Sequence, residues 1–198
     1  MITNSFSGAT AIGIKTEDFV ILAADKRITM EKTIISRSGK KIFKITDTIA
    51  LASAGRISQI QKLLDKVKSK VNLLKLNRTG LVSVKTAAKI TSKILRDSRI
   101  FLKIEIIIGG ISNNKSSLYM IDNSGALIKE NYAAIGSGAP IAIGNIEKEY
   151  DNELKLDEAR KIIINSIKSS IKRDTKTGNG IDLCIITKNN FEEETIES

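Results

Sequence analysis

The sequence predicts an α+β fold in which two mainly antiparallel sheets are stacked between layers of helices. Apolar runs of strand length come in groups, helical patterns come in pairs, and neither a repeat nor a linker divides the chain. A parallel doubly wound sheet would instead place one helix after each strand. The 198 residues, 41% of them hydrophobic, suit a single domain with a sizeable core.

Strands joined by short turns are predicted at the start of the chain. Thr10–Lys15 and Phe19–Asp25 are apolar runs separated by a polar break. A second pair, Thr33–Ser36 and Lys41–Ile45, is joined by a short polar turn, and Thr48–Ala54 follows as a further strand. We expect these runs to pair as antiparallel hairpins.

Two amphipathic helices are expected next. Apolar residues recur at steps of three and four from Ile57 to Leu74, and again from Val84 to Leu95 after a break at Thr79-Gly80. Strands then return, and four of them are predicted at Lys103–Gly109, Ser117–Ile121, Ala126–Glu130 and Tyr132–Ile135.

The last part of the chain is predicted to hold two helices and a strand. One helix begins near Ser137 and another spans about Lys155–Lys172, with acidic residues in its first turn, where the helix dipole favours them. Ile181–Thr187 is expected to be a buried strand, and Glu192–Ser198 a frayed tail.

Composition excludes several classes of function. A net charge of +10 raises nucleic acid as a partner. However, aromatic residues make up only 4% and the basic residues are spread along the chain, so few stacking platforms are available. We therefore expect no nucleic-acid partner.

The sequence contains neither a membrane-spanning segment nor a signal peptide. No apolar run is long enough to cross a membrane, and Met1–Gly8 lacks the features of a signal peptide. A cytoplasmic location is expected.

Cysteine and histidine usage narrows the chemistry further. Cys184 is the single cysteine and lies in an apolar run, which is typical of a reduced core residue. The absence of histidine excludes histidine-dependent triads and most zinc sites, and we expect neither a metal nor a cofactor. A hydrolytic site would then need another base. A threonine at a free N-terminus has one in its own α-amine, with a pKa of about 8.

Six short segments of the chain together resemble motifs of proteasome β-subunits, in the same order and at the same spacing. Each segment alone is weak evidence, but the collinear set is specific and covers nearly the whole chain. The resemblance is to archaeal-like subunits of the 20S core particle, and the lysine-, isoleucine- and glutamate-rich composition fits a heat-adapted source. The segments are Gly8–Ile14 (GATAIGI), Ala24–Thr29 (ADKRIT), Gly39–Ile42 (GKKI), Ala54-Gly55, Gly136–Gly138 (GSG) and Arg173–Gly178 (RDTKTG).

The resemblance implies a fold and a set of site residues. The fold is the four-layer αββα sandwich of the N-terminal-nucleophile hydrolases, with 1–8 as a short propeptide-like segment and 9–198 as one β-subunit domain. Asp25 and Lys41 would tune the nucleophile, and Gly55 would donate to the oxyanion. The groups implied to support the N-terminus are Ser137, Asp174 and Thr177.

Ala9 departs from the family pattern at the position of the nucleophile. The family has threonine there and cuts itself before it, whereas a methyl group can neither attack a peptide bond nor perform that cut. Ala9 lies 16 residues before Asp25 and 32 before Lys41, as in the family. Thr10 is one residue off, and because a one-residue slip turns a strand side chain to the opposite face, Thr10 should point away from Lys41. The serine usual in the family is replaced by Thr177, which keeps the hydroxyl.

The sequence therefore predicts a non-catalytic β-subunit that keeps residues 1–8. By resemblance, it would belong to a mixed seven-membered β-ring stacked with α-subunit rings, beside catalytic β-subunits. A regulatory ATPase would deliver unfolded polypeptides through the α-ring. Asp25, Lys41 and Asp174 would then persist as a structural charge cluster, because removing one member of a buried network leaves the others unpaired.

Three alternatives stay open. Ala9 can be an engineered replacement in a threonine protease, or Thr10 can serve as the nucleophile. The third is a basic adaptor that binds nucleic acid or an acidic partner, with salt-sensitive binding. The two-ring bacterial relative of the proteasome fits the chain length and the Arg173–Gly178 segment less well.

Overall fold

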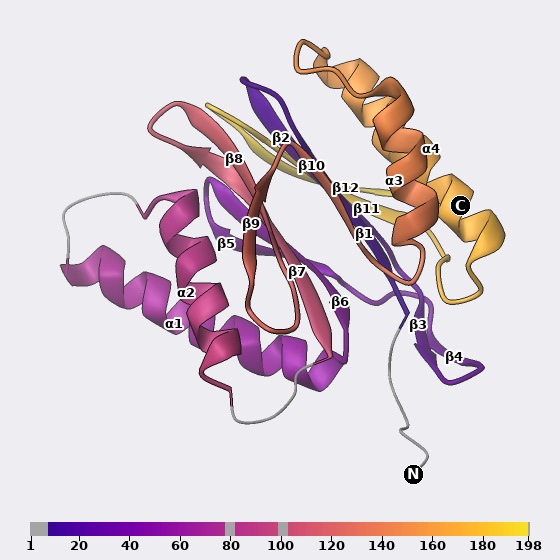
Figure 1. Cartoon of the computed structure of the whole chain (residues 1–198), viewed down its shortest axis with the longest axis horizontal. Coiled ribbons are helices and arrows are strands. Elements are labelled where there is room, and N and C mark those ends of the chain that lie inside the picture. The colour runs from indigo at the N-terminus through magenta and orange to yellow at the C-terminus, as the bar shows by residue number, and fades with distance from the viewer. Residues whose placement is uncertain (1–7, 78–81, 99–102, 198) are drawn as a thin grey trace.

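The computed structural model describes residues 8–77, 82–98 and 103–197. These residues form four layers, with two sheets stacked between two pairs of helices (Figure 1). All strand pairings in both sheets are antiparallel. The predicted α+β class with two antiparallel sheets is therefore confirmed.

The first sheet carries the start and the end of the chain. Its spatial order is β10-β1-β2-β11-β12, and it packs against the helix pair α3 and α4, which lie at the right of Figure 1. Its elements are β1 (Thr10–Lys15), β2 (Phe19–Asp25), β10 (Tyr132–Gly136), β11 (Ile181–Thr187), β12 (Phe191–Ile196), α3 (Ala139–Glu149) and α4 (Leu156–Arg173).

The second sheet is a meander from the middle of the chain. Its order is β5-β6-β7-β8-β9, and α1 and α2 cover its outer face. A separate two-stranded hairpin of β3 (Ile28–Met30) and β4 (Thr33–Ser36) stands beside the sheets. The remaining elements are β5 (Ile42–Thr46), β6 (Ile49–Gly55), β7 (Ile104–Ser112), β8 (Lys115–Ile121), β9 (Leu127–Glu130), α1 (Ile57–Asn77) and α2 (Val84–Arg96).

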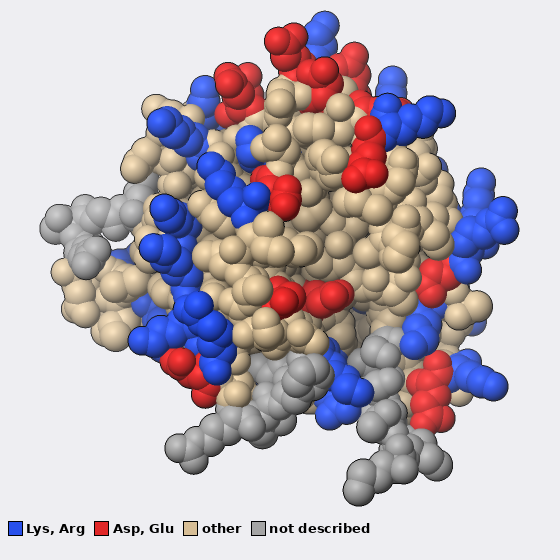
Figure 2. Space-filling model, in the orientation of Figure 1, with Lys and Arg blue, Asp and Glu red and all other residues tan. Residues whose placement is uncertain are grey.

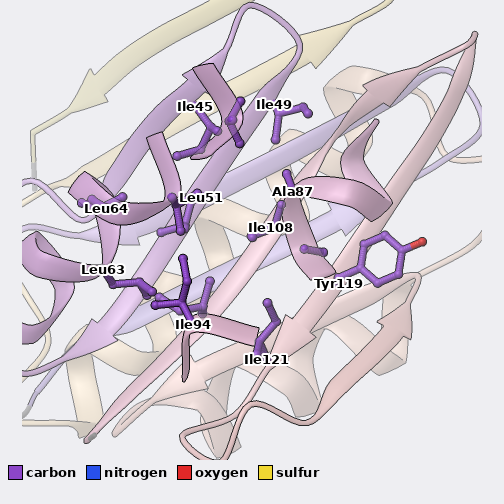
Figure 3. Packing of buried hydrophobic residues seen from close by; sticks show 14 of the residues in the cluster. Ile45, Ile49, Leu51, Leu63, Leu64, Ala87, Ile94, Ile108, Tyr119 and Ile121 are labelled. Atoms are coloured by element: carbon purple, nitrogen blue, oxygen red, sulfur yellow. The ribbon is translucent and has the colours of Figure 1, made fainter. Parts of the chain in front are cut away.

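Alternation along the strands divides the core into three apolar layers. Figure 3 shows the layer beneath α1 and α2, where Leu63 and Ile94 from the helices meet Leu51 and Ile108 from the second sheet. A middle layer lies between the sheets, and a third lies beneath α3 and α4. Along β1, Ala11 faces the middle layer while Ile12 faces the third. Neighbouring residues of β1 thus face opposite sides of the sheet.

The prediction of a frayed C-terminal tail was wrong. Residues 191–196 form β12, which pairs along β11 from Ile186↔Phe191 to Ile181↔Ile196. The tail was predicted from its position at the end of the chain, but Phe191 packs against the middle layer and Ile196 against the third layer. Apolar residues at the two ends of the strand fix its position, and the glutamates between them are mostly exposed.

The predicted hairpin of Thr33–Ser36 with Lys41–Ile45 was also wrong. Thr33–Ser36 pairs with the preceding strand, β3, which the sequence did not indicate, and β5 pairs with the following strand, β6. The segment between β4 and β5 does not form a hairpin turn. It is bonded to the end of β2, because the Gly39 N–H donates to the carbonyl of Lys26 at 2.8 Å.

The predicted break between the two helices at Thr79-Gly80 lies outside the described residues. Within the described ranges, no helix has the length and apolarity needed to span a membrane.

Candidate active site

The chain enters β1 through a cleft between the two sheets. Gly8 and Ala9 line both of two adjoining cavities, one with Lys41 and Ser53, the other with Ser137. Ala9 is 2% exposed and belongs to the apolar layer between the sheets. Ala9 therefore lies where the two cavities adjoin.

Asp25, at the end of β2, is the centre of the buried polar network. Its carboxylate is fully buried and accepts four hydrogen bonds. The donors are Lys41 Nζ at 2.6 Å, the Thr10 N–H at 2.8 Å, the Gly178 N–H at 2.9 Å and the Arg27 N–H at 3.0 Å. A charge-assisted hydrogen bond such as the one from Lys41 is stronger than one between neutral groups.

Lys41 reaches from the segment before β5 into the same network. Its ammonium donates to Asp25 Oδ1 and, at 2.6 Å, to the carbonyl of Arg27. Burial lowers the pKa of Lys41, while the charge of Asp25 and their hydrogen bond, followed by the charge of Asp174, oppose that shift. A buried amine with a lowered pKa can accept a proton from a neighbouring hydroxyl more readily than an exposed lysine.

Asp174, Ser137 and Thr177 form a second polar group next to Ala9. Ser137 Oγ donates to Asp174 Oδ2 at 2.6 Å and lies 3.4 Å from the carbonyl oxygen of Ala9. Thr177 Oγ1 donates to the same carboxylate oxygen at 2.5 Å. This carboxylate therefore connects two hydroxyls at the loop after α4 and the turn before α3.

Thr10 lies on the opposite side of β1 from Ala9. Its hydroxyl is 2.7 Å from Thr177 Oγ1, and because Thr177 donates to Asp174, Thr10 is the donor in this contact. A Cβ added at Gly138 would lie 2.1 Å from the Thr10 hydroxyl, which places that hydroxyl beneath the start of α3. Thr10 lines neither of the two cavities at Ala9.

Two glycines shape the cleft. Gly55 has φ +121° and lines both cavities, and a Cβ there would lie 2.1 Å from the carbonyl oxygen of Lys103. Gly136 has φ +91°, and a Cβ there would lie 2.1 Å from the carbonyl oxygen of Ala9. Both positions need glycine for backbone conformation and space.

The structure adds residues that the sequence did not single out as site residues. Arg27 donates from Nε to Asn179 Oδ1 at 2.8 Å and from its guanidinium to the Thr175 carbonyl at 2.7 Å. It thus joins the end of β2 to the loop after α4. Glu105 Oε2 accepts the Gly136 N–H at 2.8 Å. Glu105 could have been found from the sequence, because it is a lone glutamate inside the apolar run of β7. No local pattern in the sequence identifies Asn179 as a site residue.

The buried thiol of Cys184 offers no alternative nucleophile. Burial, assisted by the charge of Glu193, raises the pKa of this thiol to about 12. The thiolate is the reactive form of cysteine, so the group is inert near neutral pH. It lies in the apolar layer between the sheets.

Thr177→Val should destabilise the chain by about 1–3 kcal/mol, because the buried Thr10 hydroxyl loses its acceptor and Asp174 loses a donor. Thr177→Ser keeps the hydroxyl and should cost clearly less than the valine variant. Urea unfolding of the two variants beside the parent chain measures the difference. A loss for serine as large as that for valine would contradict the expectation that the hydrogen bonds outweigh the methyl group at this position.

The chain resembles known proteins over nearly its whole length. The family described as "Proteasome subunit" matches residues 5–186. "Proteasome subunit beta 2" of Thermofilum pendens is 37% identical over 94% of this chain and 92% of that protein. "Proteasome subunit beta 1" of Hyperthermus butylicus is 36% identical over 97% and 94%. "Proteasome subunit beta" of Methanopyrus kandleri is 36% identical over 91% and 88%.

Proposed function

Because the chain belongs to the proteasome subunit family, we propose that it is a β-subunit of the 20S core particle that does not itself cut peptides. Relatives named as β-subunits align with more than nine-tenths of the chain. The observation that carries the lack of activity is the methyl group of Ala9, which lies in the cleft with Lys41 and Gly55.

Thr10 does not replace the missing hydroxyl. The backbone N–H of Thr10 donates to Asp25 and its side chain donates to Thr177. If the chain began at Thr10, its amine would face Asp25 while its hydroxyl stayed beneath α3. Amine and hydroxyl would then both be engaged in the interior instead of lining the cleft, which supports a site without a nucleophile.

The role that remains is structural. We place the chain in a mixed β-ring of the cytoplasmic particle, stacked with α-subunits, beside β-subunits that carry catalytic threonines. The relatives from Thermofilum pendens and Hyperthermus butylicus are named "beta 2" and "beta 1", and such names support more than one kind of β-subunit in a particle. The polypeptides that enter would be unfolded by an ATPase at the α-ring and cut by the neighbouring β-subunits.

The test is the mass of this chain in the assembled particle. We expect intact-mass analysis to find the residues before Ala9 still attached, since no hydroxyl is present to start the cut at Gly8. A particle reconstituted with this chain as its sole β-subunit should not hydrolyse a short fluorogenic peptide. A chain that begins at Thr10 in a particle with peptidase activity would contradict the proposal.

One observation favours a second candidate, a threonine protease whose nucleophile has been replaced. The Asp25–Lys41 pair and the Ser137–Asp174–Thr177 group are complete and well bonded. A site of this kind would need only a hydroxyl at position 9. The sequence of the encoding gene distinguishes a natural alanine from an introduced one.

A further inference from the structure

Glu105 ends an otherwise apolar face of β7 at the cleft. β7 places Ile104 and Ile106 in the layer beneath α1 and α2, and Ile107 in the layer between the sheets. Because neighbouring strand residues face opposite sides, Glu105 faces the first sheet. Its register partner on β6 is Ala54, which also belongs to the layer between the sheets.

The same residue brings a carboxylate into the cavity beside Ala9. Of the described residues that line the two cavities there, Glu105 is the single acidic one. Figure 2 shows Asp and Glu gathered at the top of the molecule, away from the end at which the chain enters β1 in Figure 1. Lys103 and Lys176 line the same cavity, but across the described ranges Glu105 forms no salt bridge.

The carboxylate accepts a hydrogen bond from the backbone of the opposite sheet. The N–H of Gly136, the last residue of β10, donates to Glu105 Oε2 at 2.8 Å. β10 is the outermost strand of the first sheet, so an N–H that faces away from β1 has no further strand to pair with. The bond to Glu105 therefore ties the end of the first sheet to the second sheet beside the cleft.

Gly136 lies where a small displacement would reach the candidate active site. The pairing of β1 with β10 ends at Thr10↔Gly136, and a Cβ on Gly136 would lie 2.1 Å from the carbonyl oxygen of Ala9. The hydroxyl of the next residue, Ser137, is 3.4 Å from that carbonyl oxygen. Glu105 thus holds the turn at the point where strand pairing stops.

We propose that Glu105 is a positioning residue whose hydrogen bond to Gly136 fixes the turn 136–138 against residue 9. This inference goes beyond the proposed function, because the bond acts on the backbone whether residue 9 is alanine or threonine. Displacements of about 1 Å are enough to slow a reaction that depends on close alignment. A turn released from Glu105 would therefore slow the attack of a hydroxyl at position 9.

Glu130 shows what a merely solvated glutamate of the same sheet looks like. It is exposed, lies on the outermost strand β9, and lines neither of the two cavities at Ala9. Replacing it removes the same charge from a strand as replacing Glu105. Glu130→Leu is therefore the matched control.

Hydrogen exchange resolved to single amides tests the tie in the Ala9 chain itself. The Gly136 amide should exchange about fivefold faster or more in Glu105→Leu, because it loses a charge-assisted acceptor. Glu105→Gln keeps an amide oxygen at the same reach and should stay within about twofold of the parent. Glu105→Asp keeps the charge but is one methylene shorter, and should exchange like the leucine variant. An unchanged rate in Glu105→Leu overturns the proposal.

The assembled Ala9→Thr particle shows the effect on chemistry. Adding Glu105→Leu should slow release of the segment that ends at Gly8 and lower kcat for a fluorogenic peptide about tenfold. KM should stay within about twofold, since the lost bond acts on alignment and not on substrate binding. Glu105→Gln should recover most of both rates, and Glu130→Leu should match the Ala9→Thr particle. The urea midpoint should not move, because Glu105 is exposed.

Each other outcome also decides. If Glu105→Asp works and Glu105→Gln fails, charge and not the hydrogen bond matters, and the proposal is wrong. A loss of activity that follows a loss of stability makes Glu105 merely structural and also overturns it. If the Ala9→Thr particle is inactive, the hydrogen exchange of the Ala9 chain decides. The expected order of exchange in a chain that enters no particle supports this inference and overturns the proposed function alone.

Discussion

Replacing Ala9 with threonine is expected to release the segment that ends at Gly8 and to start peptide hydrolysis. Ala9 lines the same cavity as Lys41 and Gly55, so we expect a threonine there to place its hydroxyl near a buried amine of lowered pKa. The hydroxyl attacks the carbonyl carbon of Gly8, and the acyl group moves from nitrogen to oxygen. Water then cleaves the ester and leaves a free amine on residue 9.

The measurement is the intact mass of the chain together with cleavage of a fluorogenic peptide by the assembled particle. We expect a rise of roughly 10³-fold or more over the parent particle, the scale on which removal of a covalent nucleophile acts. Ala9→Val is the matched control, since valine has the shape of threonine without its hydroxyl. A folded, assembled Ala9→Thr particle that is neither cut nor active would show that the site is incompetent.

Lys41→Met is expected to lower the free energy of unfolding by about 3 kcal/mol. The Asp25 carboxylate would remain fully buried without its cation, and removal of one partner from a buried pair costs about 3–5 kcal/mol. We expect the lower end, because three backbone N–H groups still donate to that carboxylate. Urea unfolding followed by circular dichroism measures the loss.

A neighbouring lysine provides the control. Lys40 Nζ lies 3.1 Å from Glu193 Oε1, but the two side chains are 57% and 43% exposed, so Lys40→Met should cost no more than about 1 kcal/mol. The double variant Asp25→Asn with Lys41→Met should lose less than the sum of the two single losses. Additive losses would mean that the buried pair does not act as a unit.

The same pair gives stability a dependence on pH. Since burial lowers the pKa of Lys41, the unfolded chain binds this proton more tightly than the folded chain. The parent chain should therefore gain stability relative to Lys41→Met as the pH rises from the lowered pKa towards the usual value for lysine. Unfolding curves of both chains between about pH 7 and pH 10 test this sign. A gap that narrows with rising pH would contradict the assigned direction.

Much of the site could be predicted because its residues lie in short motifs with fixed spacing. The separations of Ala9 from Asp25 and Lys41 along the chain match the family pattern. In the structure Ala9 and Lys41 line one cavity, and Asp25 is buried behind Lys41. The two faces of β1 followed from strand alternation, which places Thr10 beneath α3. Arg27 and Asn179 were missed as a pair, since their contact joins residues 152 positions apart and no local pattern records such a contact.

The two wrong predictions of the fold, the hairpin of Thr33–Ser36 and the frayed tail, also arose because contacts between separate parts of the chain leave no local pattern in the sequence. The pairing of Thr33–Ser36 depends on how the chain turns at Gly39, where a Cβ would lie 2.2 Å from the Ile28 side chain. That close approach involves a distant neighbour and leaves no periodic signal. The frayed tail was predicted from its terminal position alone, whereas Phe191 and Ile196 hold the strand by contacts with two separate apolar layers.

The strand β12 affects whether the chain aggregates before it assembles with other subunits. It is an outer strand of the first sheet, and an outer strand offers free backbone groups to which other chains can add. Glu192, Glu193 and Glu194 stand along it. Charged side chains on an outer strand discourage sheets from joining edge to edge. The glutamate run thus acts as a gatekeeper against fibrous aggregation of newly made subunits.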